Sequence, residues 1–287
     1  MPASSGGVPA VHDVGQIITA TRQEARSPVD PEAIDARFET AQRIMREAAD
    51  AALGYHRDLT RLTVEQKGPQ DLVSEADRAV EAVIRSAVLA AFPDDGFVGE
   101  ETGSTLSDGG IWIVDPIDGT QDFLLGLPTW CVSIAFAVDG ALAFGLITNP
   151  VTGDVYAARA GAGATWNGSP IHAATATSLA DGVTAVGWSH RSSPADLAVI
   201  MERLTSAGGV IRSIGSGALM IVWVATGQCI GYVEMYIHGW DCLAAVCIVN
   251  EAGGRTTDFL GENGPAGSGP IVAGAPAVFD QLTALLP

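Results

Sequence analysis

Lysine is almost missing from this chain of 287 residues, which has a single lysine, Lys67, among 15 basic side chains. The basic residues are outnumbered by 33 aspartates and glutamates, so the formal net charge is -18. Nucleic-acid phosphates are repelled by a protein of that sign, and we therefore expect no nucleic-acid partner. The charge does not exclude a small phosphate ester as substrate, because bound divalent cations reverse the local field.

Cysteine is also scarce, and no two of the four cysteines form a CxxC pair. The cysteines lie in apolar stretches, which favours buried, reduced thiols in a cytoplasmic protein and disfavours a zinc site. Residues 1–29 lack the basic region and the long apolar region of a secretory signal. We expect most of this segment to be a flexible N-terminal tail, with a short helix over residues 14–21.

Long apolar runs without interruption are missing too. The longest uncharged run, residues 214–233, is punctuated by glycines. A buried helix followed by a buried strand fits that pattern better than a membrane span, so we expect no membrane partner. The apolar fraction of 47% excludes a disordered chain, which could not offset its ordering entropy.

The first half of the chain predicts two long helices and then a sheet. Asp30-Pro31 is typical of a helix start, and Ser74 with Asp77 resembles a capping box before a second helix that ends near residue 91. Short strands are predicted over residues 111–114, 131–138, 141–148 and 155–159. Asp139-Gly140 between the second and third of these is a strong hairpin signal. We expect residues 30–180 to combine helices with an antiparallel sheet.

After residue 180 the pattern alternates between strand and helix. Strands are predicted over residues 183–187, 210–214, 230–236 and 271–273. Helices are predicted over residues 194–206, 217–226, 240–252 and 275–286, and residues 261–269 are predicted to form a surface loop. This alternation indicates that residues 181–287 form a smaller α/β half.

The sharpest chemical signal is an apolar strand that ends in two aspartates, in the sequence DPIDGT at 115–120. Pro116 fixes one backbone angle and Gly119 permits an unusual turn, which could aim both carboxylates and the Ile117 carbonyl at one point. Such hard oxygen ligands suit Mg²⁺, Mn²⁺ or Ca²⁺. The amides of Gly119 and Thr120 suit phosphate oxygens. For an isolated motif, an ordinary turn with solvated carboxylates explains the same residues.

Three other segments bring charged residues that fit the same site. They are Glu100 and Glu101 after a short strand, Asp241 at the start of an apolar helix, and Lys67 ten residues before Asp77. Each also has a simpler explanation. A solvated acidic turn, a helix cap and a charged loop before a capped helix account for them one by one.

Together these segments resemble the inositol monophosphatase family of metal-dependent sugar-phosphate phosphatases. The resemblance extends from about residue 38 to the C-terminus. It rests on ordered motifs at residues 71–77 (DLVSEAD), 99–101 (GEE), 115–120 (DPIDGT), 240–241 (WD) and 251–254 (EAGG). The family implies an α+β fold, the layered αβαβα sandwich of the sugar-phosphatase type. It also implies a homodimer and inhibition by lithium.

The resemblance implies how the site is divided among its residues. Two Mg²⁺ ions are expected, with a weaker third near Glu100 and with Mn²⁺ as a substitute. The implied ligands are Glu100, Asp115 and the Ile117 carbonyl for the first ion, and Asp115, Asp118 and Asp241 for the second. The implied catalytic residues are Glu100, Thr120 and Asp118, with Thr120 and Glu100 orienting and deprotonating a water. Gly119 and Thr120 amides would hold the phosphate, and Lys67 and Asp77 would support the metal site.

The resemblance also implies a substrate pocket. Glu234 occupies the place of a glutamate that bonds sugar hydroxyls in inositol phosphatases, and a carboxylate can accept two such bonds. An exposed strand-end charge is the alternative explanation. Gly217 aligns with a small residue that lines the pocket, Asp241 also contacts substrate, and Tyr236 stands where many relatives have a small residue.

The predicted activity is hydrolysis of inositol monophosphate or a similar polyol or sugar phosphate monoester by metal-activated water. Three other phosphatase substrates remain as alternatives: histidinol phosphate, fructose 1,6-bisphosphate and 3′-phosphoadenosine 5′-phosphate. A protein that keeps the fold in a non-catalytic regulatory role is the alternative from a different class.

Overall fold

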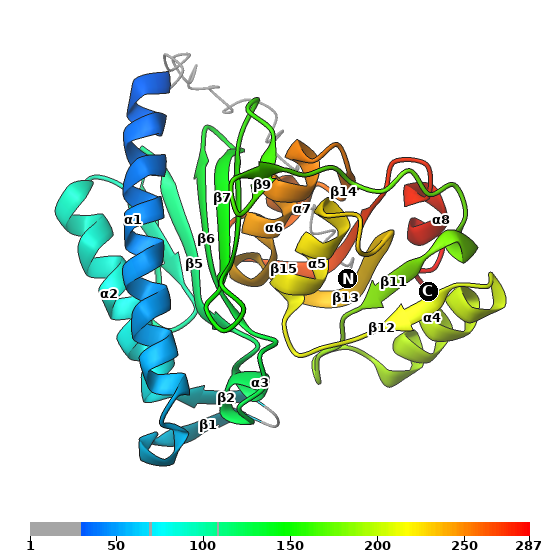
Figure 1. The fold of residues 1–287 in the computed structure, drawn as a ribbon, viewed down its shortest axis with the longest axis horizontal. Helices are drawn as coiled ribbons and strands as arrows, with labels where there is room; N and C mark the ends of the chain where they lie inside the picture. The colour runs from blue at the N-terminus through cyan, green and yellow to red at the C-terminus, as the bar shows by residue number, and fades with distance from the viewer. Residues whose placement is uncertain (1–29, 69–70, 108) are drawn as a thin grey trace, which may run out of the picture.

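Helices and sheets alternate in five layers (Figure 1). The computed structural model describes residues 30–68, 71–107 and 109–287, so the predicted tail at residues 1–29 and its short helix lie outside the described residues. In order, the layers are helices α1 (Pro31–His56) and α2 (Glu75–Ala91), an eight-stranded sheet, helices α5 (Gly217–Ala225) and α6 (Gly239–Glu251), a five-stranded sheet, and helices α4 (Pro194–Ser206) and α8 (Phe279–Thr283). The predicted αβαβα sandwich is confirmed.

The two helices of the first layer begin where the sequence predicts. Asp30 caps α1 by accepting a hydrogen bond from the Glu32 amide at 3.1 Å, and Pro31 occupies the first helical position. Ser74 and Asp77 form the predicted capping box of α2. Both helices pack their apolar faces on the large sheet, in one hydrophobic cluster with its aromatic residues.

The eight-stranded sheet is antiparallel apart from the pair β3 and β5, which is parallel. In sheet order its strands are β10 (Ser169–Pro170), β9 (Ala164–Trp166), β8 (Asp154–Arg159), β7 (Ala141–Asn149), β6 (Cys131–Val138), β5 (Ile111–Asp118), β3 (Gly96–Gly99) and β4 (Gly103–Thr105). Asp139 and Gly140 join β6 to β7 with φ values of 52° and 76°, as a two-residue hairpin turn requires. A separate ribbon pairs β1 (Val64–Gly68) with β2 (Asp71–Ser74).

The five-stranded sheet is mixed. In sheet order its strands are β12 (Val210–Arg212), β11 (Val183–Val186), β13 (Gly231–His238), β15 (Ser268–Gly274) and β14 (Arg255–Thr256). β11 runs parallel to both β12 and β13, whereas β15 is antiparallel to β13 and β14. Of two further short helices, α3 (Thr120–Leu124) follows β5, and α7 (Phe259–Asn263) lies in the middle layer, where it contacts α6, β7 and β15.

Two predictions near the C-terminus were wrong in extent. The helix predicted over residues 275–286 is only α8, because the Ala275 amide still pairs with the Ile230 carbonyl of the sheet and residues 276–278 form a turn. The loop predicted over residues 261–269 contains the end of α7 and the start of β15. The glycine-rich composition of residues 261–269 indicated a loop. Phe259 and Ile271, on either side of this segment, are buried in the core, and their packing extends α7 and β15 into it.

The middle layer touches both sheets. α6 packs against β5 to β8 on one side and against β13 and β15 on the other. The uncharged run at residues 214–233 is α5 followed by the start of β13, as predicted. Within the part of the chain that the structure describes, no helix is both long and apolar enough for a bilayer crossing.

A glycine in β7 lets α6 approach the large sheet closely. A Cβ atom at Gly145 would overlap the backbone carbonyl of Ala244 in α6. We expect Gly145→Ala to lower the free energy of unfolding by about 1–3 kcal/mol, the usual effect of overpacking. At Gly54 in α1, a Cβ atom would have no neighbour within 4 Å, so Gly54→Ala should instead stabilise by about 0.5–1 kcal/mol. Urea unfolding of both variants measures the difference; equal shifts would contradict the packing argument.

Candidate active site

Three carboxylates from two distant parts of the chain meet between the large sheet and the middle helix layer. Asp115 and Asp118 lie at the end of β5, and Asp241 lies in the first turn of α6. One oxygen from each carboxylate lies within 4.8 Å of the other two. Asp115 is 2% exposed and Asp118 is 7% exposed. Asp241 is partly exposed, so two of the three neighbouring acidic groups are buried.

An irregularity in β5 turns its two aspartates toward the same place. Residues three apart in a regular strand point to opposite faces. Here the register between β5 and β6 shifts between Asp115 and Asp118, where Pro116 interrupts the ladder. The Asp115 carboxylate accepts a hydrogen bond from the Ile117 amide at 2.9 Å. A bulge of this kind re-aims side chains at the expense of regular pairing.

Asp118 is held by the start of α5. Its carboxylate accepts a hydrogen bond from the Ser216 hydroxyl and two more from the amides of Ala218, at 2.8 Å, and Gly217, at 3.3 Å. The positive end of a helix stabilises a carboxylate in this position. The prediction missed Ser216, although a serine directly before an apolar helix is the usual signal of an N-cap.

Burial raises the pKa of all three carboxyl groups, and repulsion by neighbouring carboxylates adds to the shift for Asp115 and Asp241. For Asp115, burial and then the charges of Glu100, Asp118 and Asp241 hold the pKa well above its usual range. Burial raises the pKa of Asp118 to about 6. Burial and the charge of Asp118 raise the pKa of Asp241 to about 7. A divalent cation relieves such repulsion, and buried carboxylate oxygens are the donors that Mg²⁺ prefers, so the residues present fit the predicted metal.

The predicted water-orienting threonine lies beside the cluster, at the start of α3. Gly119 precedes it with a φ of 95°, a left-handed value that favours glycine. The Thr120 hydroxyl lies 3.2 Å from Asp77 Oδ1 and 3.1 Å from the Ile117 carbonyl oxygen, and can donate to either. Asp77 also accepts bonds from the hydroxyl and amide of Ser74. The structure therefore brings Asp77, Thr120 and the Ile117 carbonyl together.

Glu100 approaches the cluster from the neighbouring strand. It follows β3, and its amide donates to the Val114 carbonyl at 3.3 Å, which extends the parallel pairing with β5. Its charge contributes to the raised pKa of Asp115. Lys67 lies in β1, but its side chain lies outside the described part of the structure.

A cleft opens beside Asp118 and Asp241. Its other lining residues come mostly from loops and strand ends of the second sheet and from α5: Gly187, Trp188, Ser189, Arg191, Ile214, Gly215, Gly217, Met220, Glu234, Tyr236, Ile237 and His238. Glu234 is only 5% exposed, so the alternative of an exposed strand-end charge is wrong. Burial raises the pKa of Glu234 to about 8, although a hydrogen bond from the Tyr232 hydroxyl opposes this shift.

The model of the inositol monophosphatase family matches residues 27–286. The chain belongs to this family. It is 35% identical over 221 residues to the inositol-1-monophosphatase of Rhizobium meliloti, which covers 76% of this chain and 83% of that protein. It is 35% identical over 223 residues to the Nus factor SuhB of Xylella fastidiosa, and this match covers 77% of this chain and 81% of that protein. The crystal structure of the extragenic suppressor protein suhB from Bartonella henselae matches with a TM-score of 0.81 and 29% identity, over 87% of this chain and 98% of that one.

Membership in the inositol monophosphatase family confirms the predicted family and the predicted class of enzyme, a phosphoric monoester hydrolase.

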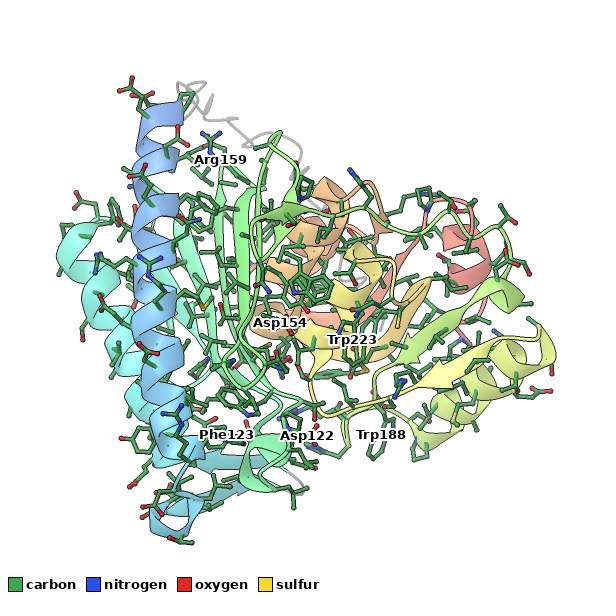
Figure 2. The ribbon with its side chains drawn as sticks, viewed as in Figure 1. Asp122, Phe123, Asp154, Arg159, Trp188 and Trp223 are labelled. Atoms are coloured by element: carbon green, nitrogen blue, oxygen red, sulfur yellow. The ribbon has the colours of Figure 1, made fainter. Side chains whose placement is uncertain are left out.

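The structure also places near the cleft two residues that the sequence analysis did not name, Trp188 and Asp122. Trp188 follows β11 and Asp122 lies in α3, and the two labelled side chains lie on the same side of the molecule (Figure 2). Both residues lie near Gly215, in the loop before α5. The Asp122 carboxylate accepts a hydrogen bond from the Gly215 amide at 3.0 Å, and Trp188 and Gly215 both line the cleft. Trp188 is 48% exposed at the mouth of that cleft.

Proposed function

We propose that this member of the inositol monophosphatase family hydrolyses a polyol or sugar phosphate monoester in a reaction that depends on Mg²⁺. Inositol monophosphate is the proposed reference substrate. The observation that carries the proposal is the meeting of Asp115, Asp118 and Asp241 beside a cleft that also contains Glu234. Phosphate release from a panel of inositol, histidinol, fructose and adenosine phosphates, with and without Mg²⁺, tests it.

The proposed metal ligands supply oxygen atoms only. They are Glu100, Asp115 and the Ile117 carbonyl for one ion, Asp115, Asp118 and Asp241 for a second, with a weaker third ion near Glu100. Bound there, Mg²⁺ would neutralise the phosphate, lower the pKa of a water and stabilise the leaving oxygen. Mn²⁺ has the same preference for oxygen and is the proposed substitute.

The protein's own groups position the reactants. Water attacks phosphorus in line with the ester bond, which breaks to give inorganic phosphate and the free alcohol. The hydroxyl hydrogen of Thr120 is directed at Asp77 or at the Ile117 carbonyl, which leaves a lone pair to orient that water. Glu100 is the proposed acceptor of the proton of the water. The amides of Gly119 and Thr120 are the proposed donors to the phosphate oxygens.

Glu234 is the proposed residue that recognises the alcohol part of the substrate. Its carboxylate lies in the cleft that contains Asp118 and Asp241, and an ionised carboxylate accepts hydrogen bonds from two hydroxyls of a polyol. Cations bound at the cluster would favour its ionised form at neutral pH. Gly217 lines the same cleft, where a Cβ atom would come 2.9 Å from Ile237 Cδ1, so glycine keeps this wall free of a side chain.

We expect Glu234→Ala to lower kcat/KM for inositol monophosphate by about 10–100-fold, because charge-assisted hydrogen bonds to the polyol are lost. The same variant should hydrolyse p-nitrophenyl phosphate at a rate within about threefold of the wild type, since that ester has no hydroxyls for Glu234 to bind. Glu202→Ala, at an exposed site on α4, is the control for loss of one negative charge. Equal losses on both esters would show that Glu234 serves the reaction itself and not the choice of alcohol.

A regulatory role without hydrolysis is the second candidate, because several relatives are named as Nus factors. The complete set of acidic residues at the cluster favours the enzyme, since a purely regulatory protein has no need for three repelling carboxylates within 4.8 Å of one another. Turnover by the purified wild type separates the two candidates.

Several finer properties belong to the same proposal. We propose a homodimer, inhibition by lithium and a cytoplasmic location. The four buried cysteines support the last of these, because free thiols persist in a reducing compartment. We also propose that residues 30–180 carry most of the metal ligands and residues 181–287 carry Asp241 and the substrate pocket. Sedimentation and a lithium titration of phosphate release test the first two properties.

A further inference from the structure

One buried carboxylate has no role in the reaction described above. Glu81 lies on α2, one helical turn after Asp77, and is fully buried. Its neighbours Val80 and Ile84 are buried apolar residues. A carboxylate in such surroundings is tolerated only where hydrogen bonds replace its lost water.

Glu81 receives those hydrogen bonds from the turn that follows β3. The Glu101 amide donates to Glu81 Oε2 and the Thr102 amide donates to Glu81 Oε1, both at 2.8 Å. Hydrogen bonds to an ionised acceptor are about twice as strong as those between neutral groups. Because each oxygen takes a different amide, the carboxylate fixes both the position and the direction of this turn.

Gly99, the last residue of β3, makes this contact sterically feasible. A Cβ atom at residue 99 would lie 2.6 Å from the carboxyl carbon of Glu81 and equally close to both oxygens. Any side chain there would push the carboxylate away from the two amides. The glycine and the two amides enclose Glu100, which lies between them in the sequence.

We propose that Glu81 is a positioning residue that fixes the main chain around Glu100 and thereby aims the Glu100 carboxylate at the metal site. The inference rests on the proposed function, in which Glu100 binds a metal ion. The amide of Glu100 is bound from the other side by the Val114 carbonyl, one residue before Asp115. Strand pairing and the Glu81 carboxylate together set the place of Glu100 relative to Asp115.

Two substitutions disturb this contact in different ways. Glu81→Gln replaces one acceptor oxygen with an NH₂ group that faces a backbone donor and also removes a charge. Gly99→Ala displaces the same carboxylate but leaves every charge in place, so it separates geometry from electrostatics. We expect each variant to raise the Mg²⁺ concentration for half-maximal activity, and the Kd for Mn²⁺, by about tenfold or more. The kcat at saturating Mg²⁺ should fall as well, because Glu100 is also the proposed acceptor of the proton of the water.

Glu251 provides a matched control. Its carboxylate also accepts two backbone amides, from Gly161 and Gly163, each at 2.9 Å. It lies ten residues after Asp241 on α6, about 15 Å along the helix from the metal cluster. We expect Glu251→Gln to lower the Tm as Glu81→Gln does, while the half-saturating Mg²⁺ concentration stays at the wild-type value.

Wild-type Mn²⁺ affinity and wild-type Mg²⁺ dependence in Glu81→Gln and Gly99→Ala would overturn the positioning role, whatever their Tm. If glutamine at 81 prevents folding, Gly99→Ala decides the question alone. Mn²⁺ affinity, measured by electron paramagnetic resonance, needs no turnover. A wild-type protein that binds Mn²⁺ but releases no phosphate would therefore contradict the proposed function, while the variant affinities would still decide the role of Glu81.

Discussion

Asparagine in place of Asp118 is expected to reduce kcat for phosphate release by about a thousandfold. That factor corresponds to about 4 kcal/mol of transition-state stabilisation, the amount typically lost with one preorganised electrostatic group. Asparagine keeps the shape of the side chain and can still accept a hydrogen bond from Ser216 or Ala218. It removes the negative charge from the centre of the cluster, so the cation and the phosphate lose their alignment.

The matched control removes the same charge from an exposed turn of the same sheet. Asp139 in the hairpin between β6 and β7 is exposed and has a φ of 52°, which asparagine adopts readily. We expect Asp139→Asn to retain activity within about twofold of the wild type, as most surface substitutions do. Equal activity of the Asp118 and Asp139 variants would remove the carboxylate cluster from the mechanism.

Removal of divalent cations is expected to abolish phosphate release and to lower the Tm. Mg²⁺ at about a hundred times its Kd should add about 2.7 kcal/mol to the free energy of unfolding, which corresponds to a rise in Tm of about 4–5 °C for a chain of this size. The physical reason is the relief of repulsion among Asp115, Asp118 and Asp241. Activity should return when Mg²⁺ is added after EDTA treatment.

The effect on Tm is expected to depend on pH. In the metal-free protein the pKa of Asp118 is about 6 and that of Asp241 is about 7, above the unfolded value of about 3.9. The folded state therefore binds the extra protons, and the free energy of unfolding falls as the pH rises from about 4 to about 7. Protons compete with Mg²⁺ for these oxygens, so Mg²⁺ should raise the Tm more at pH 8 than at pH 5. Differential scanning calorimetry with and without Mg²⁺ at pH 5 and pH 8 measures the rise in Tm. A larger rise at pH 5 would contradict the assignment of these carboxylates as metal ligands.

Local signals predicted most helices and strands because they act over a few residues. Pro31 and Ser74 mark the starts of α1 and α2, and Asp139-Gly140 marks a hairpin whose backbone angles require such residues. The surroundings of α6 could not be predicted in the same way. Its residues from Cys242 to Val249 are all buried, so this stretch has no polar face to show which side meets which sheet.

The candidate ligands could be predicted because the acidic motifs resemble those of a known family. The groups that hold them could not, since their partners are backbone amides, which have no sequence signature. Glu81 appears in the sequence only as a charge on the apolar face of α2, and the amides it binds lie about twenty residues further on. Ser216 is ninety-eight residues from the carboxylate it supports. Such contacts follow from the packing of β3, β5 and α5 around one point.

Anomalous diffraction from crystals soaked in Mn²⁺ tests the proposed metal site most directly. We expect an anomalous peak among Asp115, Asp118 and Asp241, with an oxygen atom of each carboxylate at about 2.0–2.2 Å from the ion. Crystals soaked at a Mn²⁺ concentration that supports turnover, yet without a peak at these three carboxylates, would contradict it.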